Sequence, residues 1–178
     1  MREVVSHFPA ETPAVLVVQH MPAGFTRLFA ARLAGEGGMD AEEAKDGDVL
    51  LTGRILVAPG GMQTRVCRNP DGGFRVQVTA DGAVGGHAPS VDTALFSAVE
   101  TAARETVAVV MTGMGADGAE GMKALRKAGG RCLAQDEATS VVFGMPAEAY
   151  KRGGAERLVP LGDIADAVLS FLPGSKSK

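Results

Sequence analysis

The stretch VAVVMTGMGADG, at residues 107–118, leads from an apolar run into a predicted helix through a glycine-rich turn. Its first five residues are all apolar, which is typical of a strand covered on both faces of a sheet. A helix is predicted at 117–128, and Gly129 and Gly130 end it. A buried strand that passes through a tight turn into a helix is the repeating unit of α/β proteins, so this stretch decides the fold class.

The rest of the chain extends the same pattern. Apolar runs of strand length at 14–19 and 54–59 are further buried strands, and two β-rich segments flank the turn NPDGG at 69–73. Strands that alternate with helices predict a doubly wound α/β domain with a mainly parallel sheet, helices on both faces and an inserted β-hairpin. We expect one domain over 1–172 and a disordered tail at 173–178. The other predicted elements are hairpin strands at 64–68 and 74–79, strands at 131–135 and 157–161, and helices at 25–34, 89–103, 146–152 and 162–172.

The composition is that of a folded globular protein. Of the 178 residues 46% are hydrophobic and 22% charged, and the net charge is -3. The chain has no basic stripe that would favour nucleic acid as a partner, and no apolar run long enough for membrane insertion. Residues 1–3 lack the pattern of a signal peptide, and Cys67 and Cys132 have no paired spacing. We therefore expect a cytoplasmic protein with reduced thiols.

Two polar residues follow predicted strands. His20 comes directly after the strand at 14–19, and Asp117 lies in the turn after the strand at 107–111. Because the carboxyl ends of parallel strands share one edge of a sheet, we expect the imidazole and the carboxylate to lie within hydrogen-bond distance. A histidine held by an aspartate supplies two members of a serine-hydrolase triad. The alternative is that His20 is a structural residue at a strand end.

The glycine-rich turn also permits a different interpretation. GMGADG at 113–118 fits the G-x-G-x-x-G pattern of dinucleotide-binding domains, and Asp136 follows about twenty positions later. However, the carboxylate of Asp117 would repel a pyrophosphate at the helix N-terminus, and such domains usually open with the pattern. A dinucleotide-binding oxidoreductase stays as the weaker alternative. No Cys–His cluster has the spacing of metal ligands, so we expect neither a metal nor a cofactor.

Six short motifs are more specific together than any one of them is alone. They span the chain from about residue 13 to 161 and are QHMPAGFT (19–26), GD (47–48) with APGG (58–61), PSVD (89–92), TGMGADGA (112–119), AQDEAT (134–139) and VFGMP (142–146). In kind and order they resemble the motifs of the chemotaxis protein-glutamate methylesterases, the CheB family.

This resemblance implies a function and a site. It implies hydrolysis of glutamate γ-methyl esters, and deamidation of glutamines, on the methylated cytoplasmic region of chemoreceptors. It further implies that His20 is the catalytic base, that Asp117 is the triad aspartate and that the backbone near Met114 is an oxyanion candidate. An upstream receiver domain or a chemotaxis kinase is implied as a further partner.

The chain departs from the family at the nucleophile. The family's serine lies in an Ala-Ser-Thr-Gly-Gly turn, whereas residues 1–6 already resemble the helix that follows this turn; the chain contains neither the turn nor a receiver domain. Ser6 lacks the glycine-flanked turn that exposes a nucleophile, while Ser90 fits a helix cap and Ser140 a loop. We therefore expect the chain alone to be nearly inactive as an esterase. A receptor-binding domain without catalysis is the second hypothesis.

Overall fold

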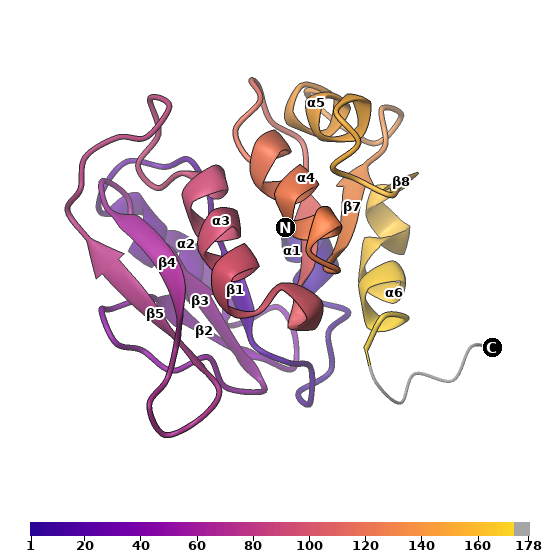
Figure 1. Ribbon diagram of the computed structural model, residues 1–178. Helices are drawn as coiled ribbons and strands as arrows, with labels where there is room; N and C mark the ends of the chain where they lie inside the picture. The colour runs from indigo at the N-terminus through magenta and orange to yellow at the C-terminus, as the bar shows by residue number, and fades with distance from the viewer. Residues whose placement is uncertain (173–178) are drawn as a thin grey trace.

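The strands form two parallel sheets and one antiparallel hairpin in the computed structural model, which describes residues 1–172 (Figure 1). The predicted tail at 173–178 lies outside the described residues. The first sheet has the order β1 (Val15–Val17), β3 (Arg54–Val57), β2 (Asp40–Glu43). The second has the order β6 (Val107–Val110), β7 (Arg131–Gln135), β8 (Arg157–Val159).

The hairpin consists of β4 (Gln63–Arg68) and β5 (Phe74–Thr79), and it turns where the sequence predicts. Helices fill most of the connections between the parallel strands. They are α1 (Arg2–Val5), α2 (Phe25–Leu33), α3 (Val91–Thr101), α4 (Ala119–Lys127), α5 (Met145–Lys151) and α6 (Ile164–Leu169), with 3₁₀ turns η1 (Ala103–Glu105) and η2 (Leu161–Asp163). The last predicted helix, at 162–172, is therefore shorter and begins with a 3₁₀ turn. No helix within residues 1–172 is long and apolar enough to cross a membrane.

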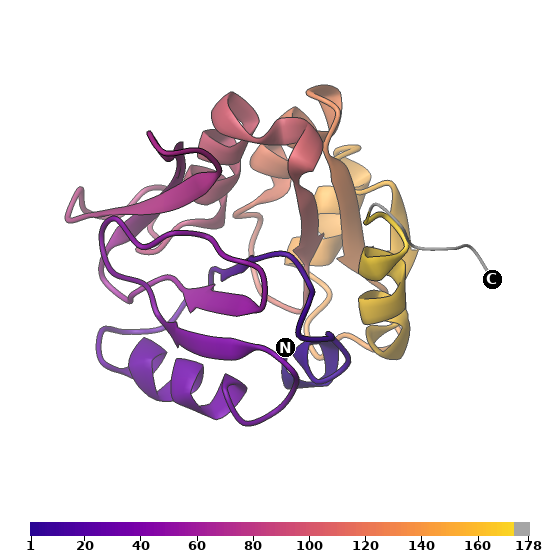
Figure 2. The ribbon, with the colours of Figure 1, turned by 90° about the horizontal axis from the view of Figure 1, so that it is seen from below.

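Helices cover both faces of the second sheet. On β7, Leu133 packs into a core formed with α1, α2 and α6, while Cys132 and Ala134 face a second core formed with α4 and α5. Figure 2 shows α1 and α2 on one side of the strands and α3 and α4 on the other. This alternation is the reason why apolar residues run continuously through the strand instead of every second position.

The first sheet is covered differently on its two faces. Ile55 and Val57 of β3 belong to the same core as Leu133, whereas Leu56 points the other way and packs with Val76 of the hairpin. The hairpin thus takes the place that α4 and α5 have on the second sheet. Because one core contains residues of both sheets, the two sheets form a single packed unit.

The mixed α/β fold with parallel strands is confirmed, and it differs from the prediction in two details. Strand β2 has the sequence DAEE and was not predicted, because acidic residues are unfavourable in strands; it is tolerated at the edge of the sheet with only partly buried side chains. The parallel strands also form two sheets rather than one. Within residues 1–172, β1 pairs on one side with β3 alone and β6 on one side with β7 alone, so each keeps a free edge.

Candidate active site

Asp117 lies in the turn between β6 and α4 and is held by the beginning of another helix, α3. Its Oδ1 accepts hydrogen bonds from Ser90 Oγ (2.9 Å) and the Asp92 N–H (3.0 Å), and its Oδ2 accepts one from the Val91 N–H (2.7 Å). Ser90 is the N-cap of α3, as predicted. The carboxylate therefore receives the unpaired N–H groups that every helix presents at its N-terminus.

These bonds fix the charge of the carboxyl group. Burial of Asp117 works to raise its pKa, but the hydrogen bonds that it accepts outweigh burial and hold the pKa below the ordinary value of 3.8. Asp92, the next carboxyl group on α3, behaves in the opposite way: burial, together with the charge of Asp117, raises its pKa. Asp117 is thus the ionised member of this pair of carboxyl groups at neutral pH.

His20 follows β1 and lies against Asp117 although 97 positions separate them. Its Nε2 is 2.7 Å from Asp117 Oδ2, which confirms the predicted contact. Because an ionised carboxylate can only accept, Nε2 must carry the hydrogen, and in the neutral imidazole Nδ1 is then the proton acceptor. No group within residues 1–172 forms a hydrogen bond with Nδ1. The ring is therefore oriented on one side and open to a proton donor on the other.

A second imidazole lies on the His20 ring and was not predicted. The rings of His20 and His87 stack with their centroids 4.0 Å apart and their planes at 9°. The sequence places His87 only in a loop between the hairpin and α3, and its contact with His20 depends entirely on tertiary structure. No local pattern around GGHAPS identifies it.

The three side chains also raise the question of a metal ion. Within residues 1–172, His20, His87 and Asp117 bring ligand atoms within 4.8 Å of one another. The lone pairs of an imidazole lie in the plane of its ring, so two parallel stacked rings do not converge on one ion. Both oxygens of Asp117 are already engaged by four hydrogen-bond donors. The geometry favours proton transfer over metal binding.

Within residues 1–172, no serine lies at the open nitrogen of His20. Ser90 is close to the pair, but its Oγ donates to Asp117 and accepts from the N–H of Thr93. Ser6, on the last turn of α1, donates to the carbonyl of Glu3 and is exposed. The structure thus brings the predicted base and acid together without a nucleophile beside them.

The turn that carries Asp117 also contains the predicted oxyanion candidate. Met114 has 83% of its surface exposed, and its N–H makes no hydrogen bond within residues 1–172. The turn is fixed on both sides of this residue: Thr112 N–H donates to the buried Gln135, and Gly113 pairs with the loop at Phe143. A free N–H on a fixed turn suits an oxyanion, and the role of Met114 remains a prediction.

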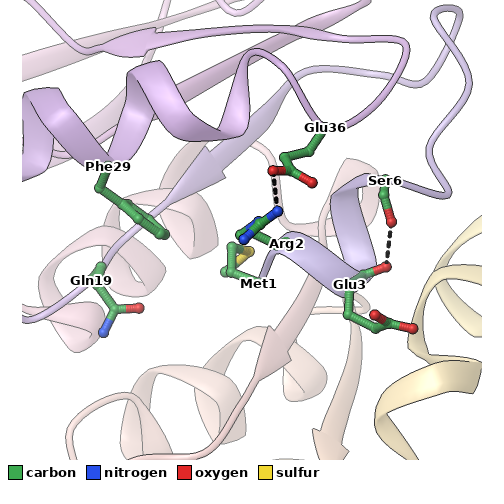
Figure 3. Close-up of a pocket in the computed structure, with 7 residues that line it drawn as sticks. All are labelled: Met1, Arg2, Glu3, Ser6, Gln19, Phe29 and Glu36. Carbon is green, nitrogen blue, oxygen red and sulfur yellow. Dashed lines mark hydrogen bonds and ion pairs between the residues drawn. The ribbon is translucent and has the colours of Figure 1, made fainter.

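A cavity of about 580 Å³ lies beside the residue that precedes His20. Figure 3 shows Gln19 and Phe29 on one side of it and Met1 with Arg2 on the other; Arg2 forms an ion pair with Glu36. The amino group of Met1 is partly buried here, and burial lowers its pKa. Space of this size therefore adjoins the free side of the His20 loop.

The fold and the His20–Asp117 pair define an α/β domain with the acid–base arrangement of serine hydrolases. Residues 1–168 match the family described as CheB methylesterase. The chain belongs to this family.

Individual relatives agree with this assignment. The chain is 49% identical over 173 residues to the protein-glutamate methylesterase/protein-glutamine glutaminase of Syntrophotalea carbinolica, covering 97% of the chain and 48% of that protein. With the protein of the same name from Bordetella bronchiseptica it is 45% identical over 172 residues, covering 97% and 49%. The crystal structure of the Thermotoga maritima CheB methylesterase catalytic domain superposes with a TM-score of 0.92 at 31% identity, covering 96% of the chain and 90% of that domain. The chain thus spans about half the length of these curated relatives but nearly all of a catalytic domain.

Proposed function

We propose that the protein containing this chain hydrolyses glutamate γ-methyl esters on bacterial chemoreceptors and deamidates receptor glutamines, with His20 as the base and Asp117 as its orienting partner. The observation that carries the proposal is the 2.7 Å contact between His20 Nε2 and Asp117 Oδ2, which leaves Nδ1 free. Relatives named for both activities support the choice of substrate. The methylated cytoplasmic region of a chemoreceptor is then the partner, and the cytoplasm is the place of action.

The geometry supports one sequence of steps. His20 Nδ1 takes the proton of a serine hydroxyl as the serine oxygen attacks the γ-carbonyl carbon, and the N–H of Met114 is a candidate donor to the resulting oxyanion. The protonated Nδ1 then returns the proton to the leaving methoxide, which departs as methanol and leaves a glutamyl-serine ester. Water repeats the sequence on this ester and releases glutamate and free serine. With glutamine as substrate, ammonia leaves in place of methanol.

The serine in this scheme comes from a segment outside the chain. Three features support a strand that ends in a Ser-Thr-Gly-Gly turn and pairs with the free edge of β1 or β6. Those edges have no partner within residues 1–172, and the contact of His20 with Asp117 brings the ends of the two strands together. The cavity beside Gln19 adds unfilled space next to the His20 loop. A receiver domain or a chemotaxis kinase that acts on the complete protein is part of the same proposal.

The test compares methanol release from methylated receptor by three proteins. They are the chain itself, the chain extended upstream to include the serine turn, and the extended chain with His20→Ala. We expect turnover by the extended chain alone, and a loss of about 10³–10⁶-fold with His20→Ala. His7→Ala is the matched control, because His7 is exposed on α1 and bonds only to Ser6 and Glu3; it should leave the rate unchanged.

Each other outcome selects a different hypothesis. Robust turnover by the chain alone would contradict the assignment of the nucleophile, and Ser6→Ala would be tested first. An extended chain that binds the receptor without turnover would favour the receptor-binding domain.

The oxidoreductase alternative is tested by calorimetric titration with NADH and NADPH, and we expect no binding. Asp117 is engaged with His20 and α3, and Asp136 Oδ1 accepts hydrogen bonds from Thr139 rather than being free for a ribose. Stoichiometric binding of either nucleotide would overturn the proposal.

A further inference from the structure

His87 has no part in the proposed chemistry, yet its ring covers one face of the His20 imidazole. The ring centroids are 4.0 Å apart and the planes differ by 9°. Aromatic rings at this separation stabilise each other and exclude water from the shared face. The contact joins the base to a loop that lies far from it in the sequence.

The loop that carries His87 is rigidly held. Gln63, on β4, is fully buried and its Nε2 donates to the carbonyls of Gly82 and His87, each at 2.8 Å. Val84 and His87 exchange backbone hydrogen bonds of 2.9 and 3.0 Å. A buried amide with every group satisfied fixes its surroundings, so the His87 backbone has little freedom to move.

The same glutamine also reaches the acid. Gln63 Oε1 accepts from the N–H of Ser90 at 3.0 Å, and Ser90 Oγ donates to Asp117 at 2.9 Å. One buried side chain therefore anchors both the ring that covers His20 and the cap that binds Asp117. This arrangement fixes the position of the two groups relative to each other.

We propose that His87 is a positioning residue of the esterase that keeps the His20 ring in the plane from which Nε2 reaches Asp117 and Nδ1 reaches the serine. Rotation of the His20 ring about its Cβ–Cγ bond would drive its edge into His87, so the stacked ring prevents this rotation. The proposal rests on the proposed function for its consequence in catalysis. Its structural part, the control of the His20–Asp117 bond, is independent of that function.

The structural part is tested by NMR on the chain itself, which has three histidines. With ¹⁵N-labelled histidine, we expect a downfield Nε2–H proton for His20, bonded to Asp117, in the wild type and in His87→Phe, which keeps a flat ring. In His87→Ala this proton should broaden or disappear, and His7→Ala should not affect it. An unchanged signal in His87→Ala would overturn the proposal. If His87→Ala fails to fold, as judged by circular dichroism, His87→Leu takes its place because it fills space without a planar ring.

The catalytic part is tested in the extended protein. We expect His87→Ala to lower kcat about fivefold to tenfold with KM within about twofold, and His87→Phe to restore kcat to within about threefold of wild type. An equal loss in both variants, or no loss in either, would overturn it. An extended protein that is inert even with His87 in place would contradict the proposed function instead, and the NMR result would still decide the role of the ring.

Discussion

The two turns that form the candidate site are held in different ways. Asp117 accepts four hydrogen bonds, two of them from the backbone of α3, and only 7% of its side chain is exposed. His20 has one hydrogen bond and one stacked ring, and 25% of its side chain is exposed. The difference shows that the acid is part of the folded framework, whereas the base is held by side chains and faces the side where a partner group is missing.

The largest effect on stability should come from removing the acid. Asp117→Ala leaves two N–H groups and the Ser90 hydroxyl without an acceptor in a buried place, so we expect a loss of about 2–4 kcal/mol. His20→Ala should cost about 1 kcal/mol or less, because its ring is partly exposed. Urea unfolding of the two variants measures the difference. Equal losses would show that the two turns are held alike. Asp136→Ala is the control, since Asp136 accepts its bonds from Thr139 at the surface.

A smaller effect is expected from crowding the His20 turn. A Cβ added at Gly60 would lie 2.5 Å from the Met21 carbonyl oxygen and 2.5 Å from the carbonyl carbon of Pro22. We expect Gly60→Ala to cost about 1–3 kcal/mol and to weaken the NMR signal of the His20–Asp117 bond, because the backbone next to His20 must shift. Gly35→Ala is the control, since nothing lies within 4 Å of its Cβ position. A Gly60→Ala protein with wild-type stability and signal would mean that the His20 turn tolerates displacement.

The pH dependence of stability separates the charge of Asp117 from its shape. The pKa of Asp117 is held below 3.8 in the folded protein, so its contribution to stability is complete above that value and is lost as the pH falls through the lowered pKa. Asp117→Asn removes the titrating group. The stability difference between wild type and Asp117→Asn should therefore be constant near neutral pH and shrink below about pH 4. Asp92, whose pKa is raised, remains in both proteins. A difference that grows on acidification would contradict the account.

The smallest effect is expected at Met114. Its side chain is largely exposed and its proposed role uses only the backbone N–H, which alanine retains. Met114→Ala should change stability by less than about 0.5 kcal/mol and kcat of the extended protein by less than about threefold. A larger loss of kcat with unchanged KM would give the thioether a role in catalysis.

The sequence predicts this site to different depths. Strand-end positions are sufficient to bring His20 and Asp117 together, because parallel strands end at one edge. The cap at Ser90 is also predicted from local residues, but not the fact that it faces Asp117. The stacked His87 and the edge strand β2 were missed, since both depend on tertiary packing that local propensity does not encode. The free edges of β1 and β6 emerge only when all the strands are placed.

The most direct test of the central claim, that His20 and Asp117 act as one catalytic unit, is a double-mutant cycle in the extended protein. Methanol release would be measured for wild type, His20→Ala, Asp117→Asn and the double variant. We expect Asp117→Asn to lower kcat by about 10⁴-fold, because the wrong imidazole nitrogen then carries the proton, and His20→Ala to lower it at least as far. The double variant should then be no slower than His20→Ala alone, since Asp117 acts only through the imidazole. Losses that multiply would show that the two residues act independently and would contradict the account.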